Sequence, residues 1–230
     1  MLGAPLLAGL LAFLVMAILF QPFNMPRSSM APTLFTGDYF FVSKYAYGYS
    51  RYSLPFSLPL FSGRILGSQP ERGDVVVFRL QRDAAFDVVK RVVGFPGDRI
   101  QMKQGVLYIN DVPVVRERLE DLVGPDLCGL PTARAERWRE TLPNGKSYEV
   151  LGCAYKSPVY NTSVFKVPEG CFFVLGDNRE YSADSRMLSM VGYVPFENLI
   201  GRVGLIFFSR ASGPSGATAN RPERFGLMVR

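Results

Sequence analysis

The stretch FDVVKRVVGFPGDRI, residues Phe86–Ile100, decides the fold of this chain. Its first half is rich in β-branched residues, which favour strands, and Gly94-Phe95-Pro96-Gly97 closes it. Pro-Gly at the centre of a turn suits type II geometry, because glycine supplies the positive φ. The stretch therefore predicts a β-strand that ends in a tight turn.

Similar strand and turn signals recur along the body of the chain. A hairpin is predicted around Asn110-Asp111, and two strands are predicted on either side of Pro168-Glu169-Gly170. The stretches that carry these signals are Asp38–Gly48, Gly73–Leu80, Gly105–Val114, Ser163–Asn178 and Leu199–Ser209. Short strands with regular turns indicate a mainly β protein, a barrel or a sandwich.

Three segments depart from this pattern. Residues 115–162 are polar and irregular, with a short helix predicted near Ala133–Thr141, and they are interpreted as an insertion or a smaller second domain. Residues 210–222 are typical of a flexible tail. Residues Tyr47–Leu66 form an apolar loop rimmed by Tyr and Arg, which either belongs to the core or rests in a membrane interface.

The chain begins with an apolar run. The nineteen residues Leu2–Phe20 carry no charge, and at about 1.5 Å each a helix of them spans roughly 28 Å, close to a bilayer core. The alternative, a cleaved signal peptide, requires a basic start and a small-x-small cleavage site, which this run lacks. We therefore expect an uncleaved transmembrane anchor, although the basic residues after it would place the body in the cytoplasm.

Composition narrows the chemistry. The 230 residues are 48% hydrophobic, with a net charge of +6 spread along the chain, so a nucleic-acid partner is not expected. There is no histidine, which excludes Ser-His-Asp and Cys-His catalysis and histidine-ligated metal sites. Two alternatives stay open for the three cysteines: one disulfide with one free thiol, or three small buried hydrophobes.

Without histidine, a serine nucleophile needs another base, and lysine serves if it is neutral at the working pH. Lowering a lysine pKa from about 10.4 to about 7 requires apolar surroundings and few carboxylates. Lys90 shares a strand face with Val88 and Val92, while Arg91 points the other way. Lys90 is therefore the candidate base, the alternative being a lysine that guards an edge strand against aggregation.

Two further stretches supply candidate partners. In MPRSSMAPTL, residues 25–34, two serines lie between Pro26 and Pro32, which restrict the backbone and help to hold a nucleophile. In GDNREYSADSR, residues 176–186, the spacing of oxygen ligands does not fit a calcium loop, and a polar network that fixes other residues fits better. An ordinary turn and a solvated loop are the respective alternatives.

Taken together, these stretches resemble the boxes of bacterial type I signal peptidase (leader peptidase), a Ser-Lys dyad serine protease family. The resemblance rests on PRSSMAPTLFTGDYFFVSKYAYG, RGDVVVF, VVKRVVGFPGD, GVLYINDVPV, FFVLGDNREYSADSR and GYVPFENLIGR, in the family's order over most of residues 1–209. It implies an antiparallel signal-peptidase-like β-fold, a partly open barrel core with a smaller β insertion, behind one N-terminal transmembrane helix. The implied division is an anchor (1–22), a catalytic core (23–100 and 171–209), an inserted β domain (101–170) and a tail (210–230).

The resemblance also implies roles for single residues. Ser29 would be the nucleophile and Lys90 the general base, while Ser182 would hydrogen-bond and orient the lysine. Asp184 and Arg186 would form a supporting salt bridge, and Gly176 would lie close behind the lysine. Shallow apolar pockets for the substrate would be lined by Phe23, Met25, Met30 and Val89.

The oxyanion hole is where this chain departs from the family pattern. The Ser29 backbone N–H would be one donor, and many family members place a serine two residues before the nucleophile as the second. Here Arg27 occupies that position. Arg27 itself, Ser28, another backbone N–H or a water are the substitutes.

The implied substrates are secreted preproteins with small side chains at the first and third positions before the cut, and no cofactor or metal is needed. The enzyme would lie in the bacterial inner (plasma) membrane as a single-pass protein, contacting the lipid bilayer, with its catalytic domain on the periplasmic or exterior side. Alternatives are a conjugation-pilus maturation peptidase, a self-cleaving repressor, or a membrane-anchored β-domain that only binds partners. A repressor would need a DNA-binding domain in place of the anchor.

Overall fold

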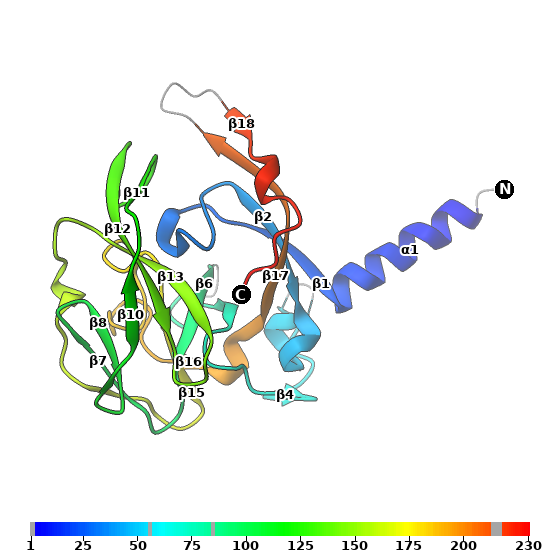
Figure 1. Ribbon diagram of the computed structural model, residues 1–230. Helices are drawn as coiled ribbons and strands as arrows, with labels where there is room; N and C mark the ends of the chain where they lie inside the picture. The colour runs from blue at the N-terminus through cyan, green and yellow to red at the C-terminus, as the bar shows by residue number, and fades with distance from the viewer. Residues whose placement is uncertain (1–2, 55–56, 84–85, 213–217) are drawn as a thin grey trace.

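The computed structural model describes residues 3–54, 57–83, 86–212 and 218–230. It is built mainly of antiparallel β-strands, as the sequence predicts, and one helix, α1 (Gly3–Ile18), projects from the β-rich body (Figure 1). The largest sheet has eight strands in the order β1-β2-β17-β5-β6-β15-β16, with β18 paired to β17. Its strands are β1 (Phe20–Asn24), β2 (Asp38–Ser43), β5 (Val75–Arg79), β6 (Asp87–Gly94), β15 (Cys171–Leu175), β16 (Val194–Pro195), β17 (Leu199–Ser212) and β18 (Thr218–Asn220).

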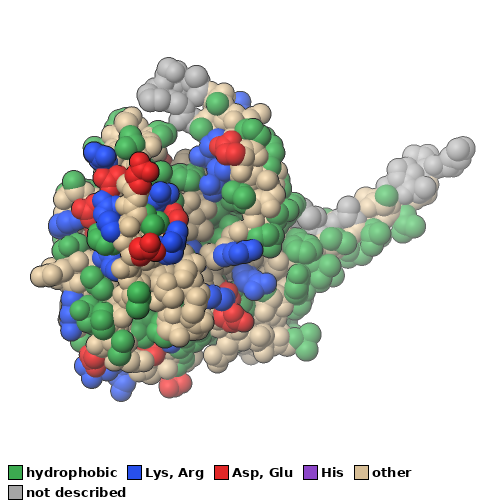
Figure 2. All heavy atoms as spheres, viewed as in Figure 1, with side chains coloured by type: hydrophobic (Ala, Val, Ile, Leu, Met, Phe, Trp, Pro, Cys, Tyr) green, Lys and Arg blue, Asp and Glu red, His purple; other side chains and the backbone are tan. Residues whose placement is uncertain are grey.

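Two four-stranded sheets lie beside the large one. The first joins β10 (Val115–Arg118), β11 (Leu122–Gly124), β12 (Ala133–Thr141) and β13 (Ser147–Gly152), and the second joins β7 (Arg99–Lys103), β8 (Val106–Ile109), β9 (Val112–Pro113) and β14 (Phe165–Lys166). A short pair, β3 (Tyr49–Ser50) and β4 (Arg64–Ile65), completes the sheets described. Figure 2 shows acidic and basic side chains intermingled over the β10–β13 region.

The predicted turns are present. Gly97 has a φ of +87°, and the Asp98 N–H donates to the Phe95 carbonyl across the turn after β6. Asn110 and Asp111 both have positive φ, the conformation that a two-residue type I′ hairpin requires. These turns could be predicted because Gly, Asn and Asp tolerate the left-handed region of the backbone, so the local sequence is enough to specify them.

The predicted helix at Ala133–Thr141 is wrong, because this stretch forms strand β12. Its Ala, Arg and Glu residues favour a helix in isolation. Here β12 pairs with β10 and β11 on one edge and β13 on the other. Pairing along both edges satisfies its backbone groups and overrides the local propensity.

The flexible tail predicted for residues 210–222 is also wrong where the structure describes it. Residues 210–212 continue β17, residues 218–220 form β18, and the last residues fold back onto the sheet. Arg221 and Arg224 form ion pairs with the fully buried Asp38, which explains why this segment is held down. Residues 213–217 of the predicted tail lie outside the described residues.

The predicted transmembrane helix over residues 1–22 is not found. Helix α1 contains 16 residues, about 24 Å at 1.5 Å per residue, and Phe20–Asn24 pair with β2 instead of extending the helix. None of the helices in residues 3–54, 57–83, 86–212 and 218–230 combines the length and the apolar character needed to cross a membrane.

The apolar loop Tyr47–Leu66 follows neither alternative throughout. Tyr47 is buried, and its hydroxyl donates to Asp74. Leu60 and Leu66, in contrast, are 72% and 83% exposed. Phe56 of this predicted loop lies outside the described residues.

Candidate active site

Ser29 and Lys90 meet at the centre of the candidate site. Ser29 lies in a single helical turn, Ser28–Met30, which follows β1, and Lys90 lies on β6 between β5 and β15. The Lys90 Nζ is 2.9 Å from the Ser29 Oγ and donates to the Val89 carbonyl at 2.8 Å. If the amine is neutral, its lone pair can accept the hydroxyl proton of Ser29 at this distance.

The surroundings of Lys90 favour the neutral amine. Its side chain is 3% exposed, and no ion pair to it is found among the described residues. Burial lowers the pKa of Lys90 from 10.5 to about 8, against the opposing charges of Asp184 and Asp177 and with help from Arg186. A lysine of this kind can act as a base near neutral pH.

The neighbouring cation, Arg91, has the opposite environment. Its guanidinium makes two hydrogen bonds of 2.8 and 2.7 Å to the Asp177 carboxylate, and both side chains are 1% exposed. Burial alone would lower the pKa of Arg91, but Asp177 outweighs it and raises the pKa. Because side chains alternate along β6, Arg91 lies on the face where Asp177 binds it, whereas Lys90 lies on the other face without an ion pair among the described residues.

The loop after β15 brings the other predicted site residues close to the dyad. The Gly176 N–H donates to Asp184 Oδ2 at 3.0 Å, and Asp184 makes two bonds of 2.8 and 2.7 Å with Arg186. Burial would raise the pKa of Asp184, but Arg186 and the Gly176 N–H hold it below its usual value. A Cβ added at Gly176 would collide with the Ser182 side chain and lie 2.6 Å from the Ser29 carbonyl.

One predicted contact is absent. The Ser182 Oγ is buried, yet it has no hydrogen-bond partner in the described part of the chain, so the expected bond to Lys90 is not formed. This hydrogen bond is absent because the Lys90 amine is directed at the Ser29 hydroxyl and the Val89 carbonyl instead. Ser182 nonetheless lies beside Gly176, as the Cβ test above indicates.

The predicted pocket residues gather in one apolar cluster. Met25, Met30 and Val89 are buried in it, and Phe23 packs against it half-buried. Val229, from the segment that folds back at the end of the chain, packs on the same cluster. Sequence reasoning missed Val229, because nothing in a predicted tail indicates its return to the core.

The expected oxyanion residues differ in burial. Arg27 is exposed, whereas Ser28 is 2% exposed, and its Oγ has no hydrogen-bond partner within the described residues. Among the substitutes considered for the second oxyanion donor, Ser28 therefore offers a buried hydroxyl that donates to no other group within the described residues.

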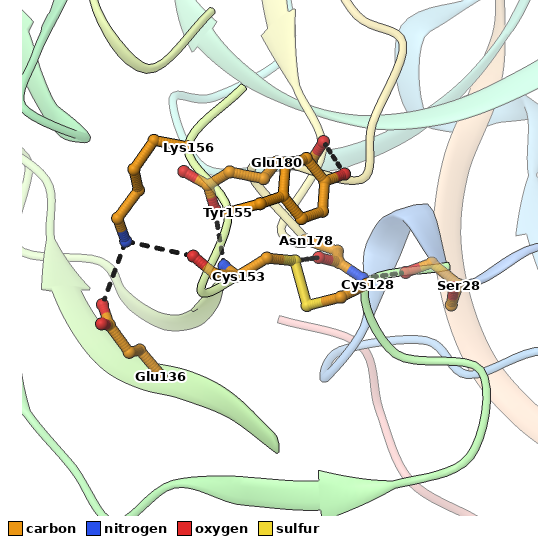
Figure 3. Close-up of a disulfide and its surroundings, with 8 residues drawn as sticks. All are labelled: Ser28, Cys128, Glu136, Cys153, Tyr155, Lys156, Asn178 and Glu180. Carbon is orange, nitrogen blue, oxygen red and sulfur yellow. Dashed lines mark hydrogen bonds and ion pairs between the residues drawn. A yellow bond between two sulfur atoms is a disulfide. The ribbon is translucent and has the colours of Figure 1, made fainter. Parts of the chain in front are cut away.

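Sequence reasoning also missed Asn178, and it left open whether two of the cysteines form a disulfide and which two. Asn178 is fully buried and donates from Nδ2 to the Ser28 carbonyl at 3.1 Å and from its backbone to the Ser29 carbonyl at 3.1 Å. Cys128 and Cys153 form a disulfide, and Cys171 is free, which resolves the alternatives for the cysteines (Figure 3). Only the density of polar residues in GDNREYSADSR signalled this contact.

Comparison with known proteins agrees with the geometry. Residues 1–208 match the family model described as signal peptidase, peptidase S26. The chain is 43% identical over 207 residues to signal peptidase I of Rickettsia typhi and of Rickettsia conorii, covering 86% of this chain and 76% and 75% of those proteins.

A solved structure of signal peptidase I from Enterococcus faecalis is also similar. It is 26% identical, with a TM-score of 0.34, and the match covers 59% of this chain and 97% of that one. The assignment rests on the family model and on the Rickettsia relatives, which span most of both sequences. This chain belongs to the signal peptidase family, peptidase S26.

Proposed function

We propose that this signal peptidase cuts its substrates with Ser29 as nucleophile and Lys90 as general base. The observation that carries the proposal is the 2.9 Å separation of Lys90 Nζ and Ser29 Oγ, at a buried lysine whose pKa burial lowers to about 8. Arg91 on the same strand is engaged by Asp177, which leaves Lys90 as the amine beside the hydroxyl.

The reaction then proceeds in two halves. Neutral Lys90 takes the Ser29 proton as Oγ attacks the scissile carbonyl, and the protonated lysine returns a proton to the leaving amine, which gives an acyl-enzyme. Lys90 next takes a proton from a water that attacks the acyl carbon, and Ser29 is regenerated. The Ser29 backbone N–H is proposed as one oxyanion donor, with the Ser28 hydroxyl as the second because Arg27 is exposed.

Asp184, Arg186, Gly176 and Ser182 are proposed to support the dyad. Asp184 is held by Arg186 and by the Gly176 N–H, so its charge is engaged beside the lysine. Because Gly176 has no side chain, Ser182 and the Ser29 carbonyl can lie against its Cα. We propose that Ser182 turns its free hydroxyl to Lys90 once substrate binds.

The substrates of a signal peptidase are preproteins that carry signal peptides. We propose that small side chains at the first and third positions before the cut enter the apolar cluster of Phe23, Met25, Met30 and Val89. A shallow pocket among buried side chains excludes larger residues because the cluster is already close-packed.

We further propose that the enzyme works against the lipid bilayer of the bacterial inner membrane, with its body on the periplasmic or exterior face. Exposed apolar residues of α1, among them Leu6 and Leu7 at 77% and 67% exposure, support contact with lipid, and Figure 2 shows hydrophobic side chains along this helix. Protease treatment of intact spheroplasts tests the orientation, since a body on the exterior face would be digested and a cytoplasmic one protected.

Cleavage of a purified preprotein by wild type, Ser29→Ala and Lys90→Met tests the dyad. Each variant is expected to lose at least about 10³-fold in kcat, since the two groups act as a unit. Ser28→Ala tests the second oxyanion donor separately and is expected to lose the about 10²- to 10³-fold that one such donor supplies. Activity in Ser29→Ala or Lys90→Met equal to wild type would reject the dyad.

A further inference from the structure

The segment that follows Leu175 is hydrogen-bonded to the end of β13. The Leu151 N–H donates to the Asp177 carbonyl at 2.8 Å, and the Arg179 N–H donates to the Leu151 carbonyl at 2.9 Å. The Cys153 N–H donates to Glu180 Oε2 at 2.9 Å. The polar loop is thereby joined to the β10–β13 sheet rather than only to the core that carries Lys90.

Asn178 is the residue through which this segment reaches the nucleophile. Its side chain and its backbone each donate to a carbonyl of the turn that carries Ser29, those of Ser28 and Ser29. Two consecutive carbonyls held from one buried residue leave the peptide between them little freedom to rotate. The orientation of this peptide sets where the Ser29 Oγ and the Ser29 N–H point.

The disulfide lies directly behind Asn178. The Cys153 Sγ is 3.8 Å from Asn178 Oδ1, a packing contact because a disulfide sulfur has no proton to donate (Figure 3). Cys153 itself is fully buried. It therefore limits how far the Asn178 side chain can withdraw from the Ser28 carbonyl.

The disulfide also lies close to the end of the turn that carries Ser29. Cys128 and Cys153 are buried in one apolar cluster with Ala31, which lies two residues after Ser29. Beside Cys128, Asp126 accepts a hydrogen bond of 2.6 Å from the Thr36 hydroxyl. The disulfide thus joins the segment that packs on Asn178 to the segment around Cys128, and both cysteines share a cluster with Ala31.

We propose that Asn178 and the Cys128–Cys153 disulfide are positioning elements that hold Ser29 in reach of Lys90, so that kcat depends on the oxidation state of this disulfide. The inference rests on the proposed Ser29–Lys90 dyad. Neither element is hydrogen-bonded to the Ser29 Oγ or the Lys90 Nζ, and neither belongs to the apolar cluster of Met25, Met30 and Val89, so substrate binding is expected to be preserved. Misplacing a catalytic atom by about 1 Å costs on the order of 10²-fold in rate.

The experiment measures kcat and KM on a preprotein-derived fluorogenic peptide for wild type, Asn178→Asp and Cys128→Ser/Cys153→Ser. Asn178→Asp keeps the shape of the side chain but removes the Nδ2 donor, and about 10- to 100-fold lower kcat is expected with KM within about twofold. Removal of the disulfide is expected to lower kcat about tenfold by the same route.

A second measurement needs no substitution. The wild type is treated with a dithiol until thiol titration finds three free cysteines in place of one; reduction adds one hydrogen to each sulfur of the disulfide, as the reagent closes to its own cyclic disulfide. The same fall in kcat is expected, and reoxidation should restore it. Cys171→Ser is the matched control, because Cys171 is the free cysteine and its variant should behave as wild type in both states.

The amplitude of the first turnover counts the active molecules and separates positioning from loss of fold. A lower amplitude with an unchanged rate per active molecule would overturn the proposal, as would wild-type kcat in both Asn178→Asp and the reduced enzyme. Ser29→Ala is measured in parallel: if it retains activity, the dyad itself fails, whereas if only the Asn178 and cysteine variants behave as wild type, the positioning inference alone fails.

Discussion

The pH dependence of cleavage is the most direct consequence of the buried lysine. With a pKa of about 8 for Lys90, the neutral fraction is about 9% at pH 7 and about 91% at pH 9. In the proposed mechanism Lys90 must be neutral to accept the Ser29 proton, so kcat/KM is expected to rise about tenfold between these pH values. The profile of kcat/KM reports the free enzyme, which is the state described by the structure.

Two substitutions should move this profile in opposite directions. Asp184 raises the pKa of Lys90, so Asp184→Asn is expected to shift the rise to lower pH. Arg186 lowers the pKa of Lys90 and binds Asp184, so Arg186→Met frees a carboxylate and is expected to shift the rise to higher pH. The opposite signs distinguish charge effects on the lysine from general damage to the fold.

The assay follows a fluorogenic peptide from pH 6 to pH 10 in detergent, with the Ser29→Ala rate subtracted as background. Circular dichroism at each pH checks that every variant stays folded. A flat wild-type profile, or a rise centred near the ordinary lysine value of 10.5, would refute the reasoning that burial prepares Lys90 as the base.

Three further predictions concern Gly176, Ser182 and the buried pair of Glu140 with Arg179. Gly176→Ala places a Cβ against Ser182 and the Ser29 carbonyl, so loss of cleavage is expected in the peptide assay, and a wild-type rate would contradict the close packing. Ser182→Ala removes a buried hydroxyl without a partner in the described residues, so kcat should fall while the urea-unfolding free energy stays within about 1 kcal/mol. Glu140→Gln breaks the buried pair with Arg179 and should cost about 3–5 kcal/mol of unfolding free energy, and a change below about 1 kcal/mol would show the pair to be dispensable.

The parts predicted correctly from sequence are those with local causes. Strand β6 and its turn follow from β-branched residues and from Pro96-Gly97, and the alternation of side chains separates Lys90 from Arg91 without any knowledge of the fold. The roles of Ser29 and Lys90 stay predictions, but the structure places the two atoms within hydrogen-bond reach.

The errors have tertiary causes. Strand β12 was not predicted because its composition favours a helix, and only pairing on both edges makes it a strand. The return of residues 218–230 depends on the buried charge of Asp38, almost two hundred positions away in the sequence from Arg224. The contact of Asn178 with the Ser28 carbonyl joins positions 150 residues apart, which no local pattern encodes.

The adjacent cations Lys90 and Arg91 differ in environment because of the loop formed by residues 176–186. Residues 176–186 carry three buried carboxylates, and the two aspartates are each bound by an arginine: Asp177 by Arg91 and Asp184 by Arg186. If Asp184 were not engaged by Arg186, it would be free to pair with Lys90 and keep the amine protonated. We therefore propose that the Asp184–Arg186 pair supports the dyad chiefly by occupying a carboxylate, which leaves Lys90 buried, without an ion pair among the described residues, and directed at Ser29.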